Sequence, residues 1–334
     1  MSASNSTWYL LLLLSLPSAC SSKGKPIDLF NQEGGDILQL RTKTSNTFAL
    51  GGRMHNALLP SSPKKWNYLE DGRGNYIIPY KIVGKYDERE KRVIESAMES
   101  IQDNTCIRFK QRNDERDYVE IHNENEGCYT WVGRSGGRTI LMLQSNYAGT
   151  CIVKGTVIHE LFHLIGLWHE QSRYDRDDYI KIHFENIAKG ESLQFRKLSR
   201  TQATTYDVPY DYGSVMHYGK KSFSANGKIT IETLDPRFQD VIGQRTGASA
   251  SDFRKVCEIY RCGKCMGRNF KQETSTKKPV VQTPTSLPGG ACIDRWGNIC
   301  KILASVHHLR CEIKQWQCCA TCAALNEGKD LSKI

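Results

Sequence analysis

Hydrophobic positions recur with the period of a helix in one early stretch of the chain. The apolar residues there are Val93, Ile94, Ala97, Met98 and Ile101. This spacing puts them on one face of an α-helix. Asp87 precedes the stretch and Glu90 stands three residues later, which is the pattern of a capping box. The pattern therefore predicts an amphipathic helix that begins at Asp87.

Further along, the pattern changes to that of strands. Residues 118–122 alternate as a half-buried strand does, and residues 138–144 form an apolar run typical of a buried strand. A second helix is expected at 155–166, and turns are expected at Asn226–Gly227 and Asp235–Pro236. Because helices and strands do not alternate regularly, we expect an α+β fold.

Residues 1–20 have the pattern of a secretory signal peptide. Residues 8–16 form an apolar run that is too short to span a bilayer, and small residues follow at Pro17 to Ala19. No later segment is apolar for long enough to span a membrane. We therefore expect a secreted, extracellular protein. The alternative is a lipid-modified Cys20, which Pro17 disfavours.

The cysteine content agrees with secretion. The chain has 13 cysteines, and removal of Cys20 with the signal peptide leaves 12, of which six lie within residues 292–322. An even number after a signal peptide predicts disulfide bonds in an oxidising compartment. The signal peptide and the adjacent Cys318 and Cys319 argue against the alternative of a cytosolic zinc–cysteine module.

Composition divides the rest of the chain into sections. Residues 21–55 are polar and contain no cysteine, so they are poor core material and are expected to form a pro-segment. The later sections are a main domain at 56–268, a linker at 269–290 rich in Thr, Ser, Pro and Lys, a cysteine-rich module at 291–323 and a tail at 324–334. The net charge of +10 comes from scattered Lys and Arg residues, which does not favour a nucleic-acid partner.

The most informative segment is HELFHLIGLWHE, residues 159–170. His159 and His163 are four residues apart, so a helix places both imidazoles on one face, where they can bind one Zn²⁺. Gly166 can end that helix, which lets His169 return as a third ligand. Three nitrogen ligands leave a fourth position for water, and Glu160 can act on that water as a base. We therefore expect one catalytic zinc ion per chain.

Two other interpretations of this segment predict different residues. A structural zinc protein would have four closed ligands, mostly cysteines. A secreted, non-catalytic binding protein with a relic peptidase domain would have lost a histidine ligand or Glu160, and all four residues are present. The enzyme interpretation is therefore preferred, with the binding protein as the alternative.

This segment and several others resemble the astacin family of metzincin metallopeptidases. The motifs are HELFHLIGLWHEQSRYDRDDYI from residue 159, SVMHY at 214–218, IPY at 78–80, GCYTWVGRSGG at 127–137, YDYGSVMHYG at 210–219 and IGQR at 242–245. The likeness covers residues 56 to about 262. It implies a two-subdomain α+β catalytic domain with a twisted N-terminal sheet and an active-site helix, followed here by a small disulfide-rich module.

The resemblance also implies roles for four residues outside the histidine triad. Met216 lies in a tight turn below the metal, and Tyr218 is a switchable fifth zinc ligand that helps to hold the oxyanion. Glu170 binds the new N-terminus after removal of the pro-segment. Asp36, within EGGDIL at 33–38, takes the place of the zinc-bound water in the precursor, although the family motif has Phe where this chain has Glu33. From the residues alone, the alternatives are a core residue for Tyr218, a surface carboxylate for Glu170 and part of a turn for Asp36.

The family alignment implies disulfide pairs as well. They are Cys128–Cys151 and Cys106–Cys262, which leaves Cys257 and Cys265 as extra cysteines that can pair with each other. The module at 291–323 resembles small six-cysteine ShK-like and PLAC-like modules. By that analogy its first and last cysteines form Cys292–Cys322, and the pairing of the inner four is open.

Together these patterns predict a secreted zinc-dependent endopeptidase, made as a zymogen, that hydrolyses internal peptide bonds of extracellular proteins. Its expected partners are protein or peptide substrates and an activating protease that cuts after Arg53. Trimming to near Asn56 or Ala57 is expected because Asn56-Ala57-Leu58 resembles the mature start of the family. The resemblance implies that substrate pairs with an edge strand near Cys128 to Trp131. A matrix or cell-surface partner is expected for residues 291–323.

Overall fold

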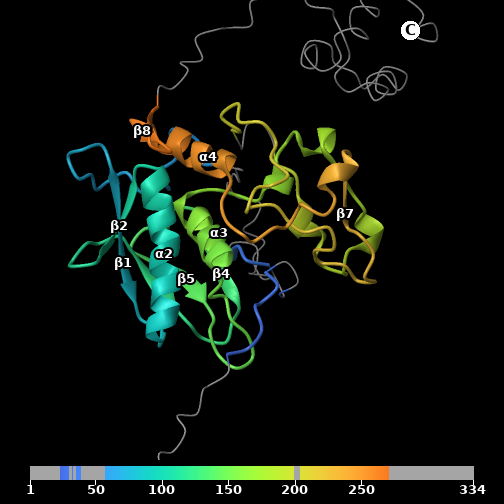
Figure 1. Ribbon diagram of the computed structural model, residues 1–334, viewed down its shortest axis with the longest axis horizontal. Coiled ribbons are helices and arrows are strands. Elements are labelled where there is room, and N and C mark those ends of the chain that lie inside the picture. Colours follow the sequence, from blue (N-terminus) through green and yellow to red (C-terminus); the bar gives the residue numbers. More distant parts are fainter. Residues whose placement is uncertain (1–22, 30–31, 33–34, 39–56, 199–203, 271–334) are drawn as a thin grey trace, which may run out of the picture. The chain divides into compact units, whose positions relative to one another are not determined.

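The computed structural model describes residues 23–29, 32, 35–38, 57–198 and 204–270 of the 334-residue chain (Figure 1). All of them belong to the first of two compact units, residues 1–272. The predicted signal peptide, the six-cysteine module and the Cys292–Cys322 bond lie outside the described residues and stay predictions. The proposed cleavage site after Arg53 also lies outside the described residues and stays a prediction.

A five-stranded sheet forms the first part of the described domain. Its strands are β1 (Tyr76–Ile82), β2 (Ile107–Gln111), β3 (Tyr118–His122), β4 (Cys128–Thr130) and β5 (Arg138–Leu143). They lie in the order β2-β1-β3-β5-β4, and all neighbours are parallel except β4, which runs antiparallel to β5 at one edge. The predicted strands at 118–122 and 138–144 are confirmed.

The two longer helices pack beside this sheet and against each other, as Figure 1 shows for α2 (Glu88–Asn104) and α3 (Lys154–Ile165). The predicted capping box of α2 is confirmed: the Glu90 amide donates to Asp87 Oδ1 over 2.9 Å, and Glu90 Oε2 accepts from the Asp87 amide over 2.8 Å. The predicted apolar face of α2 is buried at Ile94, Ala97, Met98 and Ile101. Its burial fixes the position of α3, the helix that carries the histidines.

The second part of the domain is mostly irregular. Its short elements are the 3-10 helices η2 (Glu170–Ser172), η3 (Arg176–Asp178), η4 (Phe184–Asn186), η5 (Ser192–Phe195) and η6 (Pro236–Phe238), and the antiparallel strands β6 (Ile180–Ile182) and β7 (Ile231–Thr233). Helix α4 (Ala250–Tyr260) and the hairpin of β8 (Lys264–Cys265) and β9 (Arg268–Asn269) follow. The α+β class expected from the sequence is confirmed.

Three disulfide bonds join these elements, and they are the three pairs expected within this domain. Cys106–Cys262 links the segment after α2 to the segment after α4, and Cys128–Cys151 links β4 to the segment before α3. Cys257–Cys265 links α4 to β8. Among the described residues, none of the helices is long and apolar enough to cross a membrane.

Candidate active site

Helix α3 carries His159, Glu160 and His163, and two glycines set its position. A Cβ atom on Gly155 would lie 1.9 Å from the Arg245 carbonyl oxygen, so only glycine allows this close approach. Gly166 ends the helix with φ +128°, and its amide donates to the carbonyls of Phe162 and His163. The chain can therefore turn back after Gly166, as the sequence predicts.

This turn brings His169 back to His159 and His163, so that three buried imidazoles meet. The Nε2 atoms of His163 and His169 are 3.1 Å apart, and the His159 ring lies edge-on to the His163 ring. Nδ1 of His159 lies 2.7 Å from the Val215 carbonyl oxygen, and Nδ1 of His163 lies 2.7 Å from that of Leu167. A carbonyl oxygen can only accept, so each Nδ1 carries the proton and each Nε2 presents its lone pair to the common centre.

The protonation of these rings suits a metal site. Burial lowers the pKa of His159 to about 3 and that of His169 to about 4, so both rings are neutral near pH 7. Neutral imidazole is the form that binds a metal ion.

Asp36 lies on the same centre, although it is 123 residues from His159 in the sequence. Its Oδ2 atom is 2.9 Å from Nε2 of His159, 3.0 Å from Nε2 of His169 and 3.7 Å from Nε2 of His163. A carboxylate oxygen and an imidazole lone pair are both acceptors, so this convergence fits a cation shared between them. One oxygen with three imidazole nitrogens is a donor set that suits zinc. These residues therefore fit the expected metal.

Glu160 is buried beside the triad. The Arg245 guanidinium is close enough to interact electrostatically with the carboxylates of Asp36 and Glu160. Burial lowers the pKa of Arg245 to about 10, and the two carboxylates offset part of that effect. The guanidinium is therefore still charged near pH 7 and adds a positive charge beside the triad.

Tyr218 is fully buried, and its ring lies 4.4 Å from the His169 ring, centroid to centroid. Burial first, and then the nearby Asp36 carboxylate, raises the pKa of the phenol well above its ordinary value. The hydroxyl is therefore protonated and can act as a hydrogen-bond donor. The predicted role of Tyr218 in holding the oxyanion needs this protonated form.

Met216 lies in a tight turn next to the triad. The His217 amide donates to the Ser214 carbonyl across the turn over 3.1 Å, and the next carbonyl, that of Val215, faces Nδ1 of His159. Asp252 on α4 holds the turn, because it accepts from the Ser214 hydroxyl over 2.5 Å and from the Val215 amide over 3.0 Å. The turn thus orients a histidine ring.

Glu170 is buried with two cations. It accepts from Arg173 Nη1 over 3.0 Å, from the Asp211 amide over 3.0 Å and from Lys255. Burial raises its pKa, but Lys255 and Arg173 outweigh this and lower it to about 2. Ala57, the expected mature start, pairs antiparallel with Leu167. Glu170 is thus a buried ion-pair centre rather than the surface carboxylate of the alternative interpretation.

Sequence reasoning missed Gln32 and Lys255. The Gln32 side-chain amide donates to the Cys128 carbonyl over 2.5 Å and accepts from the Cys128 amide over 3.0 Å, so it pairs with edge strand β4 as a neighbouring strand would. Nothing in the local pattern identifies Gln32. Lys255 had a signal, because it stands on the apolar face of α4, and a buried ammonium needs a carboxylate partner.

Comparisons with known proteins identify the family of this chain. The family described as Astacin, a family of peptidases, matches residues 66–261. Zinc metalloproteinase nas-5 of Caenorhabditis elegans is 43% identical over 94% of this chain and 91% of its own length. High choriolytic enzyme 1 of Oryzias latipes is 34% identical over 76% of this chain and 96% of its own length.

A solved structure is also similar. That of high choriolytic enzyme 1, a hatching enzyme zinc-protease from Oryzias latipes, covers 62% of this chain and all of its own chain, with 36% identity and a TM-score of 0.56. The family match spans the sheet, α3 and the Met216 turn, and these relatives are named as zinc proteases. Because this chain also keeps the three histidines and Glu160, the enzyme interpretation is preferred to the relic and structural-zinc alternatives. The chain belongs to the astacin family and is a zinc metalloendopeptidase.

Proposed function

We propose that this endopeptidase is secreted as an inactive precursor in which Asp36 closes the metal site until the segment before Ala57 is removed. The observation that carries the proposal is the contact of Asp36 Oδ2 with Nε2 of His159 and His169, at 2.9 and 3.0 Å. In the mature enzyme, the place of that oxygen belongs to water. The apolar run at 8–16 and the disulfide-bonded domain support secretion.

In the mature site, His159, His163 and His169 would hold the zinc. Bound zinc would supply a water of lowered pKa and polarise the scissile carbonyl. Glu160 accepts a proton from the attacking water and returns it to the leaving amine. Tyr218, whose hydroxyl stays protonated, donates to the developing oxyanion.

The pro-segment also occupies the edge of the sheet in this proposal. Gln32 takes both backbone groups of Cys128, and the Asp36 carbonyl accepts from the Thr130 amide over 3.1 Å. A peptide substrate adds to a sheet edge through the same backbone groups. Gln32 and Asp36 therefore block the substrate edge and the metal site together.

Activation gives Glu170 a further role. The chain from Ala57 runs beside the end of α3, where the Leu58 amide donates to the Gly166 carbonyl over 3.0 Å. A new N-terminal ammonium near Ala57 would join Lys255 and Arg173 around the Glu170 carboxylate.

Two partners belong to the proposal. The expected activating protease cuts after Arg53, and residues 291–323 are proposed to bind a matrix or cell-surface partner.

The Glu160→Gln variant tests the catalytic assignment. It should lower peptide turnover roughly a thousandfold or more, because the amide cannot accept the proton of the attacking water. Zinc content, measured by atomic absorption, should stay at one ion per chain. The control is Glu185→Gln, which removes an exposed carboxylate on η4. Turnover close to native in Glu160→Gln would defeat the mechanism.

The Asp36→Ala variant tests the latency assignment. The uncleaved precursor of this variant should hydrolyse a short peptide, whereas the native precursor should not. Gln32→Ala should release less activity, because it opens the sheet edge and leaves Asp36 on the metal site. Lys25→Ala, an exposed change in the same segment, is the control. An Asp36→Ala precursor that stays as inactive as native would remove this part of the proposal.

A further inference from the structure

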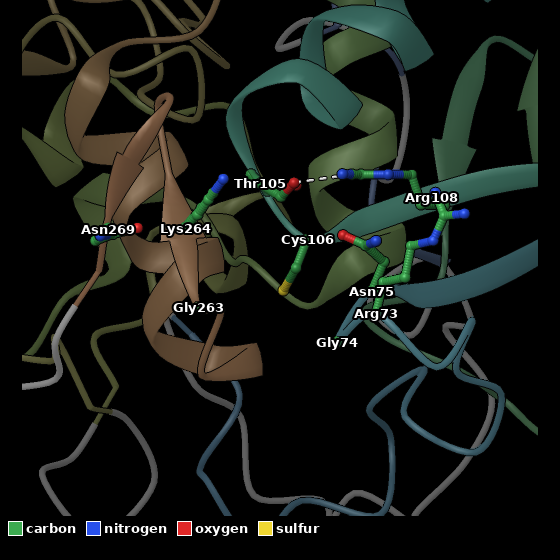
Figure 2. A pocket seen from close by; sticks show the side chains of 9 residues that line it. All are labelled: Arg73, Gly74, Asn75, Thr105, Cys106, Arg108, Gly263, Lys264 and Asn269. Carbon is green, nitrogen blue, oxygen red and sulfur yellow. Dashed lines mark hydrogen bonds between the residues drawn. The ribbon is translucent and has the colours of Figure 1, made fainter.

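A hollow of about 460 Å³ lies between the turn before β1, the start of β2 and the β8–β9 hairpin (Figure 2). Lys264 and Asn269 stand on the hairpin side, and Arg73, Asn75 and Arg108 stand across from them. None of the zinc ligands or of the residues proposed for catalysis lines it. The site proposed above therefore does not use this hollow.

The hairpin side of the hollow lies beyond the family match, which ends at residue 261. The hairpin is held in two ways: Cys265 is bonded to Cys257 on α4, and the Met266 amide donates to the Asn104 carbonyl over 2.9 Å. The wall that carries Lys264 is thus fixed against the domain. It lies just after the segment that the family description matches.

The charge of the lining is one-sided. Arg73, Arg108 and Lys264 contribute three cations, and no Asp or Glu lines the hollow. Within the described part of the chain, neither Arg73 nor Lys264 forms an ion pair, and both are exposed. Asp71, two residues before Arg73, is engaged in its own turn, where it accepts from the Asn75 side chain over 2.8 Å.

The guanidinium of Arg108 is held in place by the backbone. Its Nη1 atom donates to the carbonyls of Gln102, Thr105 and Ile107 over 2.8, 2.9 and 2.7 Å. A fixed guanidinium suits tetrahedral oxyanions, which accept its N–H groups in pairs. The side-chain amides of Asn75 and Asn269 offer further donors.

We propose that this hollow binds the sulfate groups of an acidic extracellular polysaccharide. Cations that line a concave surface concentrate positive potential there and attract anions. The three cations come from three separate segments, which suits several sulfate groups on one flexible chain better than a single small anion. The concave lining suits a polymer chain that can enter it better than a flat membrane surface. The choice of an extracellular polymer rests on the proposed secretion, whereas the binding itself needs neither zinc nor Glu160.

The test measures binding of the full-length chain to a heparin-derived hexasaccharide by calorimetry at about physiological ionic strength. Arg73→Gln with Lys264→Gln should weaken binding about tenfold, because two exposed charge contacts are lost. The matched control is Lys181→Gln with Lys189→Gln, which removes the same charge from exposed positions elsewhere and should leave the affinity unchanged. Raising the salt concentration should weaken binding of the native chain.

Three further probes decide between the sources of anionic charge. They are the desulfated hexasaccharide, inorganic sulfate and vesicles that contain phosphatidylserine, and each should bind the native chain much more weakly than the sulfated hexasaccharide. Equal weakening in the two double variants, equal binding of the desulfated sugar or preference for vesicles would overturn the proposal. The Glu160→Gln variant should bind the hexasaccharide as the native chain does. The binding proposal and the catalytic proposal can therefore fail independently of each other.

Discussion

The two parts of the catalytic domain are built in different ways. Residues 57–165 contain the five-stranded sheet and two long helices, whereas the described residues of 166–249 contain only short strands and single 3-10 turns. In the first part, parallel strands and helices satisfy most backbone groups among themselves. In the second part, irregular backbone is buried around the active site and must find other hydrogen-bond partners.

Buried polar side chains supply those partners. Arg176 donates to the carbonyls of Gln171 and Phe195, and Gln171 accepts from the Tyr218 amide over 3.0 Å. Glu170 accepts from the Asp211 amide over 3.0 Å. The active site therefore joins an apolar scaffold, which carries His159 and His163, to a polar network, which carries His169 and Tyr218.

The largest expected effect is in the polar network. Glu170→Ala leaves the ammonium of Lys255 buried without its carboxylate, and the free energy of unfolding should fall by about 3–5 kcal/mol. The double variant Glu170→Gln with Lys255→Met should regain much of that loss, because Arg173 keeps its two hydrogen bonds to Asp175. Denaturant unfolding of the disulfide-bonded precursor measures both. Equal losses in the single and double variants would contradict the ionic origin.

A somewhat smaller effect is expected in the apolar scaffold. Ile94 is fully buried on α2, and Ile94→Ala should lower the free energy of unfolding by about 2–4 kcal/mol through lost burial and a residual cavity. Glu99→Ala on the exposed side of α2 should change it by less than about 0.5 kcal/mol. Ile94→Val, which removes one methylene group, should restore most of the loss. If Ile94→Ala cost no more than Glu99→Ala, the described core would be wrong.

The smallest effect concerns a polar contact at the edge of the second part. His183 lies 2.9 Å from Glu185 and 2.8 Å from Glu232, and hydrogen bonds to these carboxylates raise its pKa. The charged ring is therefore favoured in the folded state, and its contribution to stability is present below the ordinary pKa of about 6.5. This contribution is lost as the pH rises through the raised pKa.

Thermal unfolding of native protein and the His183→Gln variant at a series of pH values measures this contribution. The difference in unfolding midpoint should be largest at acidic pH and shrink as the pH rises above about 6.5. A difference that stays constant with pH would show that the ring acts through its size alone.

The sequence predicts the features that depend on neighbouring residues and misses those that depend on distant ones. Helix α2, strands β3 and β5 and helix α3 follow from periods and caps that lie within a few residues of each other. The histidine triad follows for the same reason, because a helix brings His159 and His163 together. The roles of Lys255 and Gln32 cannot be predicted in this way. Lys255 contacts Glu170, which is 85 residues away in the sequence, and Gln32 contacts Cys128, which is 96 residues away. Such pairs are set by tertiary packing, which no local pattern encodes.

The bond between Cys106 and Cys262 makes a covalent ring that encloses most of both parts, because its ends are 156 residues apart in the sequence. A single nick in any loop within that ring opens the chain but releases neither fragment. The helix with its two histidines and the segment with the third thus stay tethered after one cut. A peptidase at high local concentration can be cut by other copies of itself. The disulfide ring keeps the two fragments of a molecule joined after one such cut.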